Sequence, residues 1–206
     1  MRVLTLVMAM MLSLPALAAE LESELADVQQ RWAHIQYELP ESERAKAFEN
    51  LVSDAGDFVE RYPGRAEPLI WQGIVLSTYA GAKGGLGALG LVKDARHSLE
   101  AALDIDPEAL QGSAYTSLGS LYYQVPGWPL SFGDDEQAEK YLQKALAINP
   151  GGIDPNYFFG DFLLEQGESS MARVYLNNAL KASPRAGRQT ADTGRREEIR
   201  NRLGKI

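Results

Sequence analysis

Side chains suited to catalysis are few in this sequence. Its two histidines are His34 and His97, and neither lies in a metal-binding spacing such as H-E-x-x-H. The sequence has no cysteine, which excludes a thiol nucleophile, disulfides and thiolate metal sites. Acidic runs such as residues 134–136 are explained by helix starts, where negative charge is favoured. We therefore expect no catalytic residue, no metal site and no cofactor.

One glycine motif has the spacing of a nucleotide-binding loop. Gly85, Gly87 and Gly90 form G-x-G-x-x-G within residues 79–90. That fingerprint requires a preceding strand and a parallel sheet, whereas the surrounding pattern is helical and no β-rich run is visible. We interpret this segment as a flexible, partly apolar loop between two helices.

The segment from Tyr122 to Asp134 has the residue types of a binding surface. It contains Tyr122, Tyr123, Trp128 and Phe132, together with two prolines that restrict the backbone and lower the entropy lost on ordering. Tryptophan and tyrosine are enriched among the residues that dominate binding energy at interfaces. A stiff loop would present Trp128 and Phe132 to a partner. Alternatively, these two side chains fold inward and fill the gap between helix pairs.

A further aromatic group, at residues 157–159, lies on one expected helix. Three consecutive helical residues point in different directions, so at least one of these side chains must face the core and the others are available to line a groove. The candidate residues for binding a ligand or partner are Tyr122, Tyr123, Trp128, Phe132, Tyr157 and Phe158.

The elements that position these residues repeat along the chain. Residues 102–107, 145–150 and 179–184 each end an amphipathic helix at a proline, which cannot continue the helical hydrogen-bond ladder. Before each proline, small and apolar residues recur at helical spacing, which places them on one face of the helix.

Each of these helices follows a partner helix that carries a central glycine: Gly73, Gly119 or Gly160. A glycine inside a helix costs up to ~1 kcal/mol relative to alanine, which is tolerable where it lets a neighbouring helix approach closely. The last unit, from Pro150 to Pro184, resembles the tetratricopeptide repeat of 34 residues. We predict an all-α, tetratricopeptide-like helix-pair solenoid with about four helix pairs and a C-terminal capping helix.

The first residues predict export. Arg2 precedes an apolar run that ends in the small residues around Ala18, the pattern of a secretory signal peptide at residues 1–18. The run is shorter than the roughly 20 residues that a membrane-spanning helix needs. We expect cleavage after about Ala18 and a single helical-repeat domain at residues 19–206, in the periplasm and without a membrane anchor. Loss of Arg2 leaves 19 basic and 28 acidic residues, a net charge of −9 that argues against a nucleic-acid partner.

Several sequence motifs resemble the TatT-like group of periplasmic tetratricopeptide proteins, the T-components associated with some TRAP-type solute transporters. The motifs are Y-T-S-L-G-S-L-Y-Y-Q-V-P-G-W-P at 115–129, F-G-D-D at 132–135 and L-V-K-D-A-R at 91–96, and the resemblance covers roughly residues 65–200. It implies that the protein partners a periplasmic solute-binding protein and handles an apolar or organic-acid ligand. Members of the group can be lipid-anchored, whereas this chain has no cysteine to carry a lipid. The alternative is a general cell-envelope scaffold that gathers proteins and binds no small ligand.

Overall fold

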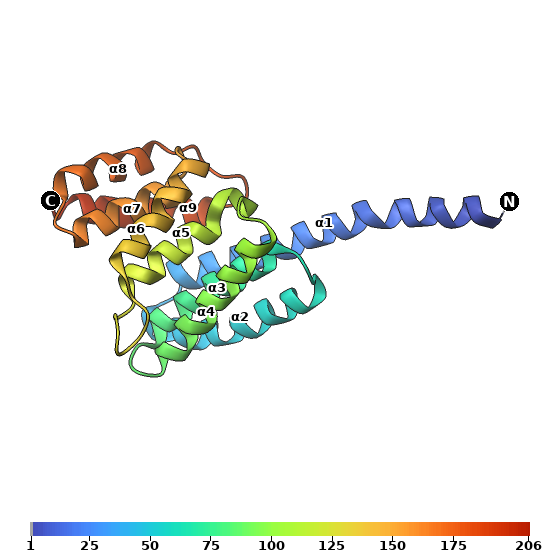
Figure 1. The fold of residues 1–206 in the computed structure, drawn as a ribbon, viewed down its shortest axis with the longest axis horizontal. Helices are drawn as coiled ribbons and strands as arrows, with labels where there is room; N and C mark the ends of the chain where they lie inside the picture. The colour runs from blue at the N-terminus through green and yellow to red at the C-terminus, as the bar shows by residue number, and fades with distance from the viewer. Residues whose placement is uncertain (1) are drawn as a thin grey trace.

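The computed structural model describes the backbone of residues 2–206 and the side chains from residue 17 onward. This part of the chain contains nine helices and no strand (Figure 1). The helices are α1 (Arg2–Tyr37), α2 (Glu41–Arg61), α3 (Ala66–Lys83), α4 (Ala88–Ile105), α5 (Ala109–Gln124), α6 (Asp135–Ile148), α7 (Ile153–Glu165), α8 (Ser169–Lys181) and α9 (Gln189–Leu203).

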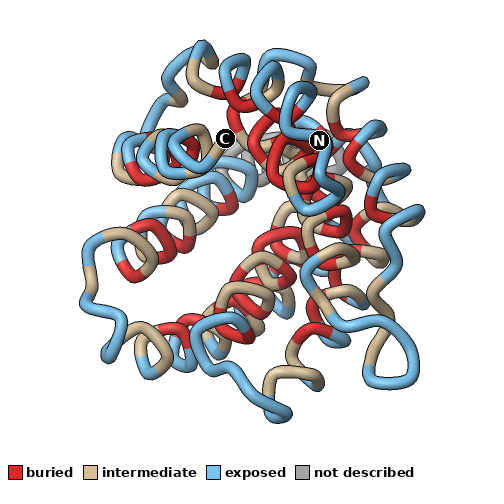
Figure 2. Tube along the Cα trace, turned by 90° about the vertical axis from the view of Figure 1, so that its left-hand side faces the viewer, coloured by how far each residue is buried: buried red, intermediate tan, exposed pale blue. Residues whose placement is uncertain are grey.

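Neighbouring helices pack as pairs that stack into a solenoid. The closest packing joins α3 with α4, α5 with α6 and α7 with α8, while α2 packs against both α1 and α3. Helix α9 follows the last pair and contacts α7, α8 and α1. Buried residues lie where neighbouring helices face one another (Figure 2). These contacts confirm the predicted all-α, tetratricopeptide-like solenoid of four helix pairs and a C-terminal helix.

The three central glycines lie where paired helices approach most closely. A Cβ atom added to Gly73 would lie 2.5 Å from Cγ of Leu99, and one added to Gly119 would lie 2.5 Å from Cγ of Leu142. Gly160 has the same relation to a leucine of α8, at 2.9 Å. Such distances are far below van der Waals contact, so the backbone of the first helix fits against its partner only without a side chain. The predicted reason for these glycines is confirmed.

The predicted loop at residues 79–90 is mostly helical, which corrects the sequence interpretation. Helix α3 continues to Lys83 and α4 begins at Ala88, so residues 84–87 make the whole connection. Gly84 and Gly85 have positive φ angles of 64° and 66°, a conformation that suits glycine in a tight turn. The extra residues therefore lengthen the two helices. No strand precedes the glycine motif in the described chain, so the context of a dinucleotide site is missing.

The aromatic segment is likewise shorter as a loop than the sequence indicated. Helix α5 runs to Gln124, so Tyr122 and Tyr123 are helical, and the connection covers residues 125–134. Backbone hydrogen bonds hold it: the N–H of Gly133 donates to the carbonyl of Pro126 at 3.0 Å, and the N–H of Asp134 to that of Tyr122 at 2.9 Å. The Asp134 carboxylate then caps α6 by accepting from the N–H of Gln137 at 3.0 Å.

The N-terminal part of α1 extends away from the other helices (Figure 1). The expected signal peptide at residues 1–18 falls almost wholly outside the described side chains, and Met1 lies outside the described backbone. Residues 17–20 are exposed, and Leu21 is the first described residue that is buried. Among the described residues, no helix is long and apolar enough to cross a membrane.

A central cavity as the candidate ligand-binding site

The inner helices of the solenoid surround a cavity of about 1120 Å³. Side chains of α1, α3, α5 and α7 line it, and residues of α9 and the α8–α9 connection complete the wall. Ligand sites in proteins are typically concave, mostly preformed and of about 300–1,000 Å³. The cavity is therefore large enough for a small organic molecule together with water.

Contacts between the two ends of the solenoid bound the cavity on one side. The ring of Tyr37 in α1 lies against Gly194 in α9, where an added Cβ atom would come within 2.2 Å of the ring. Thr190 donates a hydrogen bond to Glu38 at 3.2 Å beside this contact. Ile199 and Arg195 of α9 are buried. Helix α9 is a capping helix that also contributes to the cavity wall.

The cavity lining combines two tryptophans with several hydroxyl groups. Trp32 and Trp71 meet edge to face, with ring centroids 5.9 Å apart. The indole N–H of Trp32 donates to the hydroxyl of Thr78 at 3.0 Å, which fixes the ring and leaves its faces for packing. The neighbouring helix α5 contributes the hydroxyl-bearing residues Ser113, Thr116, Ser117 and Ser120.

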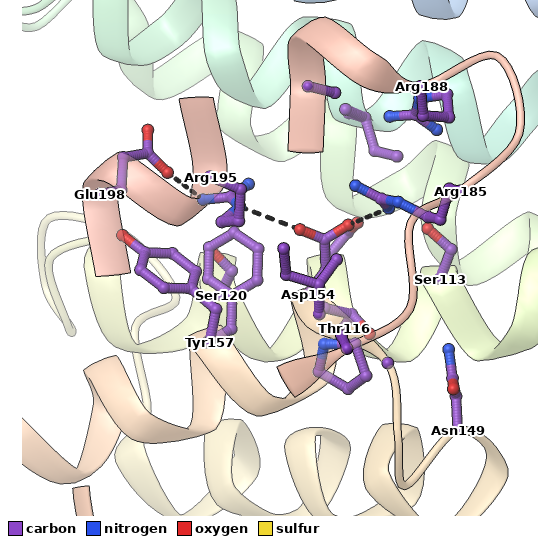
Figure 3. A pocket seen from close by; sticks show the side chains of 18 of the residues that line it. Ser113, Thr116, Ser120, Asn149, Asp154, Tyr157, Arg185, Arg188, Arg195 and Glu198 are labelled. Carbon is purple, nitrogen blue, oxygen red and sulfur yellow. Dashed lines mark hydrogen bonds and ion pairs between the residues drawn. The ribbon is translucent and has the colours of Figure 1, made fainter. Parts of the chain in front are cut away.

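The α8–α9 region brings arginine side chains to the cavity, and carboxylates neutralise three of them. Figure 3 shows Asp154 between the guanidinium groups of Arg185 and Arg195, at 2.6 and 2.9 Å. Burial alone would raise the pKa of Asp154, but these two cations outweigh it and hold the pKa at about 2. Arg202 pairs with the buried carboxylate of Asp161 at 2.7 Å. In each of these pairs a carboxylate neutralises the charge of the arginine, and the pairs stabilise the cavity wall.

Arg188 differs from the other cavity arginines because no carboxylate pairs with it among the described residues. Its Nε–H group is buried without a hydrogen-bond partner in that part of the chain, and its guanidinium lies 5.0 Å from the centroid of the Trp71 ring. Burial, and next the positive charge of Arg185, lower the pKa of Arg188 to about 10. The nearby charges of Asp154 and Asp192 oppose this shift in part, and the side chain remains charged at neutral pH, so the cavity contains a cation without a direct ion pair.

An unusual backbone turn lies at the start of α5. Leu110 and Gln111 both line the cavity and have positive φ angles of 48° and 57°. Left-handed conformations of residues other than glycine are costly and concentrate at functional sites. The turn brings both residues to the cavity lining, and the Gln111 amide oxygen accepts a hydrogen bond from Asn149 at 3.1 Å.

The six residues predicted from sequence separate into three groups. Tyr123, Tyr157 and Phe158 line the cavity, and the Tyr123 hydroxyl donates to Asp161 at 2.9 Å. Tyr122 and Phe132 pack against each other at 5.2 Å and do not line it. Trp128 is 90% exposed at the tip of the α5–α6 connection. Each of the two alternatives for the loop therefore holds for one residue: the side chain of Phe132 turns inward and that of Trp128 points outward. Binding of a ligand or partner by the six residues stays a prediction.

The charged and tryptophan residues of the cavity were missed by sequence reasoning. Trp32 and Trp71 belong to no recognisable motif, and the arginines between Arg185 and Arg202 lie in or next to the expected C-terminal capping helix. One signal was available: this arginine-rich segment stands out in a chain with a net charge of −8. The two histidines, by contrast, are exposed and outside the cavity.

The fold and cavity together define an all-α, tetratricopeptide-like repeat protein with a cavity on its inner face. The tetratricopeptide repeat model matches residues 130–151, which cover the end of the α5–α6 connection and helix α6. A comparison with curated proteins gave no match. The repeat match supports a tetratricopeptide-like family, whose repeats typically act as non-catalytic protein-interaction modules.

Proposed function

We propose that this protein is an exported, TRAP-transporter-associated module that holds a small organic anion in its central cavity and partners a solute-binding protein. The observation that carries the proposal is Arg188, a partly buried cation that forms no ion pair with a carboxylate among the described residues. A buried charge is costly unless it is paired, so an unpaired arginine in a cavity favours an anionic ligand. The paired arginines around Asp154 do not give this signal.

The chemistry around Arg188 favours a carboxylate with an apolar body. A planar guanidinium can donate two parallel hydrogen bonds to one carboxylate. Trp71 lies under the guanidinium, and Trp32, Ile74 and Leu110 provide apolar surface in the same cavity. Hydroxyl groups on α5 are available to bind further polar atoms or water. This combination suits a monocarboxylate better than a sugar or a nucleotide.

Export and a protein partner are part of the same proposal. The burial pattern supports export, because removal of residues 1–18 leaves Leu21 and the rest of the packed face of α1 in place. The repeat match supports a protein partner, and the resemblance to T-components supports a solute-binding protein in that role. A pull-down from periplasmic extract tests this part. Recovery of several unrelated envelope proteins without a solute-binding protein would favour the general scaffold instead.

A titration with small carboxylates tests the ligand. The chain has three tryptophans, of which Trp32 and Trp71 line the cavity and Trp128 is exposed. A Trp128→Phe variant therefore reports cavity binding through intrinsic fluorescence. We expect phenylacetate and hexanoate to change the signal and uncharged phenylacetamide to bind at least tenfold more weakly.

Two arginine variants provide the control for that titration. Arg188→Gln should remove the preference for phenylacetate over phenylacetamide, because the cation that distinguishes them is gone. Arg200→Gln, at an exposed position of α9 outside the cavity, should leave the preference unchanged. Equal binding of the acid and the amide by the unaltered cavity would reject an anion site.

A further inference from the structure

A second concave surface lies between α6, α7 and α8 and shares no residue with the central cavity. We call it the outer groove; it has a volume of about 570 Å³. Helix α7 contributes to both sites through different residues, with Tyr157 and Phe158 at the cavity and Phe159, Phe162 and Leu163 at the groove. The groove is therefore a separate binding surface that the proposed ligand function does not use.

The floor of the outer groove is apolar and firmly packed. Phe159 and Phe162 stack with their ring centroids 6.2 Å apart, and Tyr175 meets Phe159 edge to face at 4.6 Å. Both phenylalanines are buried, so the floor is held by the core of the last repeat. Met171 lines the same groove and is 48% exposed. A partner would meet a preformed apolar surface, which keeps the ordering cost of binding low.

The rim of the outer groove is acidic. Asp135, Glu136, Glu139 and Glu168 line it, and no lysine or arginine does. Glu136 pairs with Lys140 at 2.7 Å. Among the described residues, no basic side chain lies within 4 Å of the carboxylates of Asp135, Glu139 or Glu168. The rim thus carries a local negative charge that a basic occupant would neutralise.

We propose that the outer groove docks a cationic peptide segment of a partner protein. An apolar side chain of that segment would pack on Phe159, Phe162 and Met171, while flanking lysine or arginine residues would face the rim. Tyr175 offers an aromatic face for one of these cations. A second copy of this chain is a poorer occupant, because its net charge of −8 would be brought towards the same acidic rim.

Peptide binding to the full chain tests the proposal by fluorescence anisotropy. The probe is a labelled peptide of sequence Lys-Lys-Leu-Phe-Lys-Lys, and its partner is Glu-Glu-Leu-Phe-Glu-Glu, which has the same apolar centre. We expect the basic peptide to bind with an affinity that falls as salt is added, and the acidic peptide not to bind. Failure of the basic peptide to bind, or equal binding of both peptides, would overturn the proposal.

Variants locate the bound peptide. Reversing both Glu139 and Glu168 to Lys should weaken the basic peptide about tenfold, in line with the small energy of each exposed pair. Glu197→Lys changes an exposed acid on α9 outside the groove and should change affinity by less than about twofold. An equal loss in Glu197→Lys would show non-specific attraction and reject the site.

The apolar contact and the alternative occupant have their own readouts. Met171→Ala removes an exposed side chain, so it should weaken the peptide several-fold while leaving the thermal unfolding curve in place. Sedimentation velocity tests the second copy. A dimer that dissociates in the Glu139, Glu168 double variant would assign the groove to self-association and overturn the proposal.

Discussion

Replacing Arg188 with methionine should make the ligand-free protein more stable. The pKa of Arg188 is lowered from 12.5 to about 10 by burial and by Arg185. At roughly 1.4 kcal/mol for each pH unit, the charged form is destabilised by about 3 kcal/mol, and partial contact with solvent reduces this figure. Loss of the contact with Trp71 removes about 1 kcal/mol of favourable energy. The net gain for Arg188→Met is therefore about 1–2 kcal/mol at neutral pH.

The pH range follows from the direction of the shift. A base whose pKa is lower in the folded protein is destabilising wherever it is charged in both states, which here means below about pH 10. The penalty declines as the pH rises from 10 towards 12.5. Measurements at neutral pH therefore capture the whole effect, and the stability of the variant relative to the natural chain should not change between mildly acidic and mildly alkaline solution.

Urea unfolding followed by far-UV circular dichroism measures this difference. Arg195→Met is the matched control, because Arg195 is paired with Asp154 and Glu198 at 2.9 and 2.5 Å. That variant leaves Glu198 without its cation and Asp154 with Arg185 alone, and it should lose about 3–5 kcal/mol. If Arg188→Met instead lost more than about 1 kcal/mol, Arg188 would be stabilising the fold, and the case for a cation without a direct ion pair would be wrong.

Three further predictions concern the wall, the repeat and the loop. Asp154→Asn should lower the unfolding free energy by about 2 kcal/mol above pH 4, because the pKa of Asp154 is about 2 in the folded protein and ordinarily 3.8. The difference in unfolding free energy between the variant and the natural chain should shrink as the pH falls from 4 through 2. Acid titrations of both proteins would show this. Gly119→Ala should lower the unfolding free energy by about 1–3 kcal/mol in urea unfolding, since its Cβ would lie 2.5 Å from Leu142. An unchanged stability would contradict the close packing of α5 on α6. Gly151→Ala is the control, because its Cβ would meet open space. Trp128→Ala should change stability by less than about 0.5 kcal/mol in the same assay because the side chain is 90% exposed, and a loss above 1 kcal/mol would show that the loop packs on the body.

The repeat architecture could be predicted from sequence because it depends on local spacing. The apolar stripe of α6 and the glycine of α5 face each other, and Gly119 and Leu142 meet as their positions in the repeat require. The aromatic loop was harder, because nothing in its sequence distinguishes Phe132, which packs against Tyr122, from Trp128, which points outward. Which side chain turns inward depends on the neighbouring helices.

The cavity could not be predicted, because it depends on contacts between distant parts of the chain. Trp71 and Arg188 are far apart in sequence and meet across the closed solenoid. Closure itself rests on the fit of Tyr37 against Gly194, which no local pattern reveals. The arginine-rich segment was visible as a departure from the acidic composition, but its pairing with Asp154 was not. Which arginine pairs with which carboxylate can be known only from the three-dimensional positions of both side chains.

The structure of a crystal of the protein grown with phenylacetate tests most directly whether the cavity binds an organic anion. We expect the ligand inside the central cavity, with its carboxylate oxygens about 3 Å from the guanidinium of Arg188 and its ring against Trp71. Asp154 should keep its pairs with Arg185 and Arg195. A cavity that contains only water at saturating phenylacetate, or a ligand whose carboxylate points away from Arg188, would contradict it.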